Sequence, residues 1–163
     1  VGRPYNQGYP IRGIVKRNVL YLRNFENGRW PAGNPETGYL NCDGSPTKTL
    51  LLNQRRKGVD KYWRLNFGKR PISEMYDLWN DPDCVRNLAG VEKYYKLERS
   101  LKSQLLGMLK EQRDPRVYDR GFIFEKYPFV GDWNDFYERY RSGKPTPRTG
   151  WVNQNDYERR PLD

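Results

Sequence analysis

Residues 70–82 read RPISEMYDLWNDP. Pro71 stiffens the start of this stretch, residues 74–78 carry its apolar side chains, and Asn80-Asp81-Pro82 favours a turn. Because the apolar run is too short for a stable helix and prolines bound it on both sides, it predicts a β-strand followed by a turn. The NLA at 87–89 then leads towards a long helix.

Two shorter segments near the start of the chain have the composition of paired strands. Residues 11–15 and 19–22 are largely apolar, and the polar pair Arg17-Asn18 separates them. Strands joined by such a short polar break form an antiparallel hairpin. Together with the strand at 74–78, they predict a small antiparallel sheet.

Three segments are predicted as helices. The first spans residues 46–58, with Ser45 as its N-cap, and the second spans residues 60–67, with Asp60 as its N-cap. The third, over about 91–112, repeats apolar residues at three- and four-residue steps, which is typical of a helix that packs one face against a sheet. That apolar stripe comprises Tyr94, Leu97, Leu101, Leu105, Met108 and Leu109.

The predicted fold class is α+β, with a small antiparallel sheet packed against the long helix, irregular loops and an extended tail. Residues 1–114 form the main domain and residues 115–163 form an extension, because Asp114-Pro115 ends the long helix. Within the extension, residues 132–140 predict a short helix that carries Trp133 on its apolar side. The remainder lacks a core of its own, so we expect it to pack on another surface or to be partly disordered.

The composition favours a polyanionic partner. The 163 residues carry 30 Lys and Arg against 20 Asp and Glu, a net charge of +10. Such an excess suits nucleic acid, an anionic membrane or a sulfated glycan without choosing among them. The chain contains no histidine, which excludes a Ser-His-Asp triad, a Cys-His pair and a histidine metal site within it.

The two cysteines and the start of the chain say less about function than the net charge does. Cys42 and Cys84 have the spacing of neither a zinc site nor a redox motif, so a disulfide and two buried thiols both remain open. No apolar stretch approaches the ~20 residues of a membrane span. The chain begins without methionine in a polar segment, and we expect it to be part of a longer protein whose signal peptide lies outside these residues.

Four motifs follow one another along the chain: YPIR at 9–12, WPAG at 30–33, GSPT at 44–47, and the strand, Asp-Pro turn and NLA of 74–89. Their order resembles the C-terminal subdomain of the type I sulfatases, most closely the heparan N-sulfatase (sulfamidase, N-sulfoglucosamine sulfohydrolase) group. The last motif is shared across that superfamily, and the WPAG and GSPT motifs carry the narrower assignment. The resemblance covers about residues 5–140.

The resemblance implies a catalytic domain that precedes this chain in a larger hydrolase. In the family, that domain holds a calcium ion and a formylglycine made from Cys or Ser in a Cys/Ser-x-Pro-x-Arg motif. Neither Cys42 nor Cys84 lies in such a motif, so no catalytic residue or metal ligand is assigned here. The implied partners are the catalytic domain, on which residues 115–163 would pack, and a sulfated saccharide substrate, in a periplasmic, secreted or lysosomal protein.

Five residues are candidates for a rim that contacts this substrate. Arg12 and Lys48 supply positive charge for sulfate groups, and Lys48 lies in the first turn of a predicted helix, whose N-terminus favours anions. Trp30 offers an indole ring for stacking against a sugar. Asp43 and Ser45 offer contacts to sugar hydroxyl groups.

Two other roles remain open. A stand-alone basic module for heparin-like glycans or nucleic acid would show steeply salt-dependent binding to DNA as well as heparin, whereas the sulfatase interpretation expects no nucleic acid partner. An inert appendage that only shields apolar surface of another domain would expose apolar patches when isolated.

Overall fold

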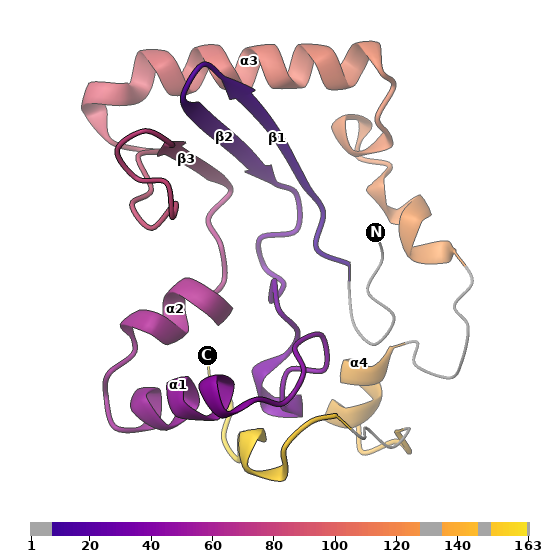
Figure 1. The fold of residues 1–163 in the computed structure, drawn as a ribbon. Helices are drawn as coiled ribbons and strands as arrows, with labels where there is room; N and C mark the ends of the chain where they lie inside the picture. The colour runs from indigo at the N-terminus through magenta and orange to yellow at the C-terminus, as the bar shows by residue number, and fades with distance from the viewer. Residues whose placement is uncertain (1–7, 128–134, 147–150, 163) are drawn as a thin grey trace. The chain divides into compact units, whose positions relative to one another are not determined.

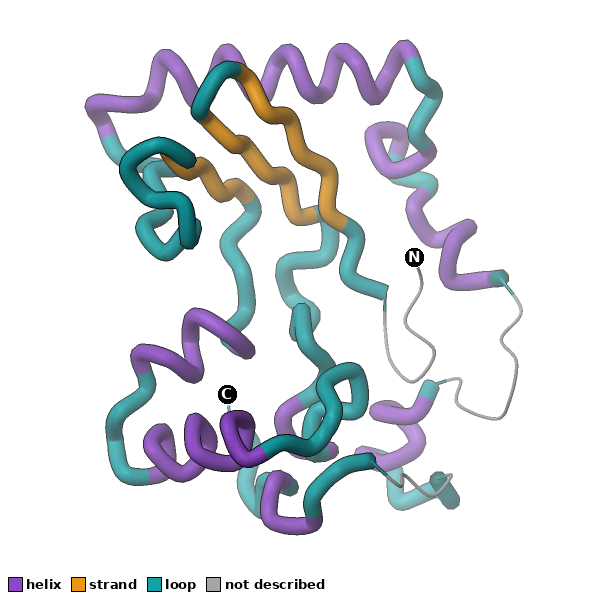
Figure 2. The backbone as a smooth tube through the Cα atoms, viewed as in Figure 1, coloured by secondary structure: helices purple, strands orange, loops and turns teal. Residues whose placement is uncertain are grey.

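The computed structural model describes residues 8–127, 135–146 and 151–162 and contains strands and helices connected by long loops (Figures 1 and 2). The chain separates into two units, which are described one at a time. Unit 1 comprises residues 28–70 with the described parts of 1–9 and 127–163, and unit 2 comprises residues 10–27 and 71–126. The longer elements are β1 (Ile11–Lys16), β2 (Val19–Asn24), α1 (Pro46–Arg56), α2 (Lys61–Phe67), β3 (Ser73–Asp77), α3 (Tyr95–Glu111) and α4 (Phe136–Arg141).

Unit 2 is built on a three-stranded antiparallel sheet with the order β1-β2-β3. The hairpin register pairs Ile14 with Tyr21, and the second ladder pairs Tyr21 with Met75. A tight turn at Arg17, which has a positive φ of 55°, connects β1 to β2. The predicted hairpin, the predicted strand near 74–78 and the α+β fold class are therefore confirmed.

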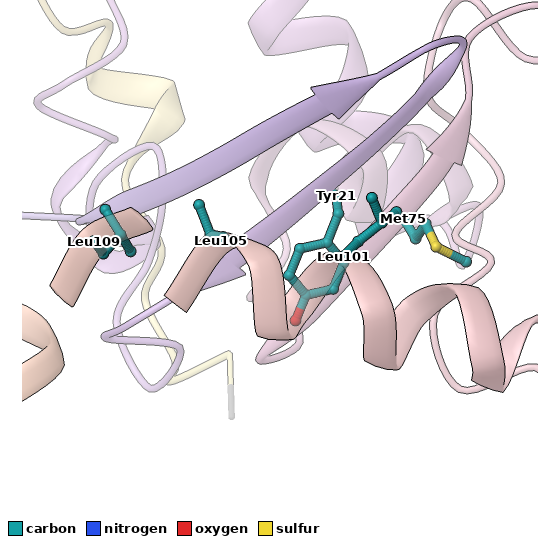
Figure 3. Packing of buried hydrophobic residues seen from close by; sticks show 5 residues of the cluster. All are labelled: Tyr21, Met75, Leu101, Leu105 and Leu109. Atoms are coloured by element: carbon teal, nitrogen blue, oxygen red, sulfur yellow. The ribbon is translucent and has the colours of Figure 1, made fainter. Parts of the chain in front are cut away.

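The core of unit 2 lies between this sheet and α3. Tyr21 and Met75 project from the sheet towards Leu101, Leu105 and Leu109 of the helix, and all five side chains are buried (Figure 3). The three leucines are four residues apart, so they form one ridge on the surface of α3. The leucine ridge therefore packs against one face of the sheet, as the apolar periodicity of this segment predicts.

The predicted apolar stripe of α3 is wider than the face that the sheet covers. Leu97 is 40% exposed and Met108 is 43% exposed, so the prediction that both pack in the core is wrong. Leu97 lies one turn before Leu101 on the same ridge but outside the cluster that packs against the sheet, and Met108 turns away at a three-residue step from Leu105. The helix also starts later than predicted, because residues 92–94 form a 3-10 turn before Tyr95.

The NLA motif completes the exposed edge of β3. The backbone N–H of Met75 donates to the Asn87 side-chain oxygen at 2.9 Å, and the Leu88 N–H donates to the Met75 carbonyl at 2.8 Å. The same Asn87 oxygen accepts the Ala89 N–H. The motif thus satisfies backbone groups of β3 that would otherwise form a free sheet edge, and it leads the chain into α3.

Unit 1 has its own core beneath α1 and α2. Tyr39, Leu52, Trp63 and Phe67 are buried together. Ser45 caps α1 as predicted, since its side chain accepts the Lys48 N–H at 3.1 Å. Asp60 does not cap α2: its carboxylate accepts the guanidinium of Arg64 one turn later instead, so that predicted cap is wrong.

The C-terminal segment packs on unit 1. The Gly44 N–H donates to the Trp151 carbonyl at 2.7 Å, and the Thr49 hydroxyl donates to the Asp156 carboxylate at 2.8 Å. Of the helix predicted at 132–140, the structure describes the part from Phe136 onwards as α4. Trp133 lies outside the described residues. The predicted boundary at residue 114, and the docking of the extension on a catalytic domain, stay predictions.

Candidate functional site

Unit 1 carries a cluster of two indole rings and two cations, formed by Trp30, Trp63, Arg55 and Lys69, which we call the indole cluster. The Trp30 and Trp63 rings meet edge to face, with centroids 5.9 Å apart and an interplanar angle of 70°. The Lys69 ammonium lies 4.7 Å from the centroid of Trp30, and the Arg55 guanidinium carbon lies 4.3 Å from that of Trp63. Each cation is held at an indole ring, within the range of a cation–π attraction.

The cluster rests on a rigid support. The Trp63 indole N–H donates to the Tyr39 hydroxyl at 2.7 Å, and the Tyr39 ring packs on Phe67 with centroids 4.7 Å apart. Tyr39 is fully buried and adopts a positive φ of 60°. Burial raises the pKa of Tyr39, so its hydroxyl stays neutral and accepts the indole N–H. The hydrogen bond to Tyr39 thereby fixes the buried Trp63 ring. Trp30 is only half-buried and Lys69 is exposed, so both can be reached from solvent.

Lys48 is buried beside Tyr39 and bonded inside the protein. Its ammonium donates to the carbonyls of Gly38 and Cys42 at 2.6 and 2.7 Å and lies 3.6 Å from the Asp156 carboxylate. Burial lowers the pKa of Lys48 below its ordinary value. This placement gives Lys48 a structural role and removes it from the residues that we propose for a substrate rim.

Arg12 lies in unit 2, on β1. Its guanidinium pairs with the Asp114 carboxylate at 2.6 Å, and the same carboxylate accepts the Arg116 N–H at 2.9 Å. Although burial acts in the opposite direction, these hydrogen bonds and charges hold the pKa of Asp114 below its ordinary value. Arg12 therefore secures the sheet to the segment that follows α3.

The other predicted site residues belong to unit 1. Trp30 is a member of the indole cluster, Ser45 uses its hydroxyl to cap α1, and Asp43 is exposed in the loop just before that cap. The predictions that these three contact a substrate stay predictions. Arg12 belongs to the other unit.

Arg55, Trp63 and Lys69 were missed as site residues. In the sequence, Trp63 falls within the predicted helix at 60–67, and the cations enter only through the total charge. One signal was available, because residues 28–70 are rich in cations and carry only Glu36, Asp43 and Asp60 as acids. The cations are Arg29, Lys48, Arg55, Arg56, Lys57, Lys61, Arg64, Lys69 and Arg70.

The cysteines and possible metal ligands complete the description. Cys42 and Cys84 are both free thiols, so the disulfide alternative is not realised. Across residues 8–127, 135–146 and 151–162, no group of three or more Cys, Asp or Glu side chains is arranged to hold a metal ion. Within the same described parts of the chain, no helix is long and apolar enough to cross a membrane.

Comparison with known proteins relates the chain to sulfatases. It is 26% identical over 106 residues to an ulvan-active sulfatase of Formosa agariphila, and the aligned region is 65% of this chain. That region is only 18% of the relative, so the chain spans less than a fifth of the protein that it matches. No protein-family model matches the chain. The similarity supports the predicted relationship to sulfatases at the level of the family and does not reach the heparan N-sulfatase group.

Proposed function

We propose that this chain is the C-terminal part of a sulfatase that hydrolyses sulfate groups of a sulfated polysaccharide. The observation that carries the proposal is the similarity to the ulvan-active sulfatase, which extends over 106 residues and covers a minor part of that larger enzyme. The matched relative acts on ulvan by its name, and we extend only the class of substrate to this chain. A narrower alternative for the substrate is a heparan-type N-sulfated saccharide, and it rests on the WPAG and GSPT motifs.

The chemistry of sulfate release belongs to a preceding catalytic domain in this proposal. A formylglycine and a calcium ion would be held there, because this chain contains no Cys/Ser-x-Pro-x-Arg motif. A polysaccharide substrate also places the enzyme outside the cytoplasm, in the periplasm, the lysosome or the medium. This chain contributes support for that domain and a rim for the substrate.

The indole cluster is the best candidate for the rim. Trp30 offers a half-buried ring, Lys69 is an exposed ammonium beside it, and Arg55 adds a second cation over Trp63. Aromatic faces suit the apolar face of a sugar ring, and cations suit its sulfate groups. Asp43, which is exposed in the loop before α1, would contact hydroxyl groups.

The test uses the intact gene product that contains this chain, with a sulfated oligosaccharide as substrate. Trp30→Ala and Lys69→Ala are each expected to raise KM about tenfold, which is the scale of one lost charge-assisted contact, with kcat little changed. Lys57→Ala is the matched control, because Lys57 is an exposed cation at the end of α1 and outside the cluster. Unchanged KM in both cluster variants would remove the rim from the proposal.

A basic binding module for heparin-like glycans or nucleic acid is a second candidate. The excess of cations over acids in residues 28–70 favours it. Such a module would bind duplex DNA and heparin with a steep dependence on salt concentration. Binding to sulfated oligosaccharide with weak DNA binding at 150 mM salt, a concentration of about physiological strength, would favour the sulfatase instead.

A further inference from the structure

Trp79 is the most exposed large apolar side chain among the described residues. It is 83% exposed, whereas Trp63 is 7% exposed. Tryptophan is highly buried on average in folded proteins, because its ring removes a large apolar area from water. Trp79 follows β3 directly, in a loop that Figure 1 shows curling beside the end of that strand.

The turn that carries Trp79 is fixed by the carboxylate of Asp77. One Asp77 oxygen accepts the Trp79 N–H at 3.0 Å and the Asn18 side-chain N–H at 2.9 Å, and the other accepts the Asn80 side-chain N–H at 2.8 Å. The hydrogen bonds from Asn80, and those from Trp79 and Asn18, lower the pKa of Asp77. The carboxylate is therefore charged at neutral pH and holds the turn in one conformation, which reduces the ordering cost of binding.

The surroundings of Trp79 are polar. Asp81 uses both carboxylate oxygens to accept the N–H groups of Val85 and Arg86, at 3.1 and 2.8 Å. The Leu78 N–H donates to the Asn18 carbonyl at 2.7 Å, which brings the hairpin turn and its exposed Arg17 to the same loop. Arg86 is also exposed. The loop also carries the exposed acid Asp83, whereas the carboxylates of Asp77 and Asp81 accept N–H groups within the loop. A single exposed ring with polar groups and two arginines around it suits a sulfated sugar.

We propose that the Trp79 turn is a saccharide-binding platform. The Trp79 ring stacks on the apolar face of a sugar ring, and Arg17 and Arg86 attract its sulfate or carboxylate groups. The identity of the ligand rests on the proposed function, because that function supplies a sulfated polysaccharide as the protein's substrate. The platform itself needs no catalysis, so it can be tested by binding alone.

The test measures the Kd of the full-length protein for ulvan oligosaccharide by calorimetry. Trp79→Ala is expected to weaken binding by about tenfold, since removal of one stacking ring costs that order of affinity. Trp79→Tyr retains a ring and is expected to restore most of the affinity. Val85→Ala, which removes apolar area from the same loop, is the matched control because Val85 is 56% exposed.

The outcomes separate the platform from the proposed function. Release of sulfate from a small aryl sulfate, measured in parallel, reports whether the protein is a sulfatase at all. Loss of ulvan binding in Trp79→Ala without any sulfatase activity in the parent would sustain the platform and reject the proposed function. Equal Kd values for the parent and Trp79→Ala, with unchanged thermal unfolding, would overturn the platform whatever the activity.

Discussion

The Lys48 ammonium and the Asp156 carboxylate lie 3.6 Å apart in the interior of unit 1, and both side chains are almost fully buried. The pair joins α1 to the C-terminal segment, where the Thr49 hydroxyl also donates to Asp156. Burial of two charges is costly, and their mutual attraction and hydrogen bonds offset that cost. The C-terminal segment is therefore part of the unit rather than a loose arm.

Replacing Lys48 by Met should destabilise the protein strongly. The substitution leaves Asp156 without its cation and leaves the carbonyls of Gly38 and Cys42 without a donor. Removing one member of a buried ion pair costs about 3–5 kcal/mol. Chemical denaturation would measure the free energy of unfolding, with Lys57→Met at an exposed position as control. A loss no larger than that of the control would contradict the buried pair.

The Arg12–Asp114 pair should make stability sensitive to acid. The pKa of Asp114 is lowered in the folded protein, so the folded state binds fewer protons than the unfolded state over the range between the two pKa values. Its contribution is present above the pKa of the unfolded state and is lost as the pH falls through the folded value. Asp114→Asn should remove this part of the pH dependence and lower stability at pH 7 by about 1–3 kcal/mol.

The matched control for that experiment is Asp83→Asn, because Asp83 is an exposed acid in the same unit. Thermal unfolding between pH 3 and pH 7 would be followed for the parent and both variants. A pH profile of Asp114→Asn that superimposes on that of the parent would show that the pair does not couple folding to protonation.

Two leucines one turn apart on α3 should differ sharply in their effect on stability. Leu101 is 1% exposed and packs against Tyr21 and Met75, whereas Leu97 is 40% exposed. Leu101→Ala should cost about 2–5 kcal/mol, because it leaves a cavity in the core. Leu97→Ala, the same substitution one turn earlier, should cost under about 1 kcal/mol. Similar losses in urea titrations of the two variants would contradict the packing in Figure 3.

Loss of the α1 cap should lower the free energy of unfolding by less than loss of the core residue Leu101. Ser45→Ala removes the side-chain oxygen that accepts the Lys48 N–H, which should lower the free energy of unfolding by about 1 kcal/mol. Thr47→Ala serves as the control within the first turn, where the exposed Thr47 is not the cap. If both variants unfold at the same denaturant concentration as the parent, the cap contributes nothing measurable.

Local patterns carried the prediction of the sheet and of the long helix. Apolar composition and the polar break at Arg17-Asn18 mark β1 and β2, and prolines bound the segment of β3. These features act within a few residues, so they are readable without tertiary contacts. The cap by Ser45 was predictable for the same reason, whereas Asp60 has the same cap chemistry but bonds Arg64 instead.

The exposure of Leu97, the burial of Lys48 and the assembly of the indole cluster depend on tertiary contacts, which local sequence patterns do not show. Leu97 has the spacing of a core residue, but its exposure depends on how far the sheet extends under α3. Lys48 has the position of an anion-binding residue, but the carbonyls that bury it come from residues 38 and 42. Arg55 and Lys69 meet the indole rings through the packing of α1, α2 and the loop that carries Trp30, and no sequence spacing indicates that.

The most direct measurement is the release of inorganic sulfate by the intact gene product that contains this chain. The purified protein would be incubated with ulvan oligosaccharides and, separately, with N-sulfated heparan oligosaccharides in the presence of calcium, and free sulfate would be quantified by ion chromatography. We predict sulfate release from one of the two substrates, at a rate that Lys69→Ala lowers at limiting substrate concentration and Lys57→Ala does not. No release of sulfate from either substrate, together with steeply salt-dependent binding to DNA, would contradict a sulfatase and identify a basic binding module.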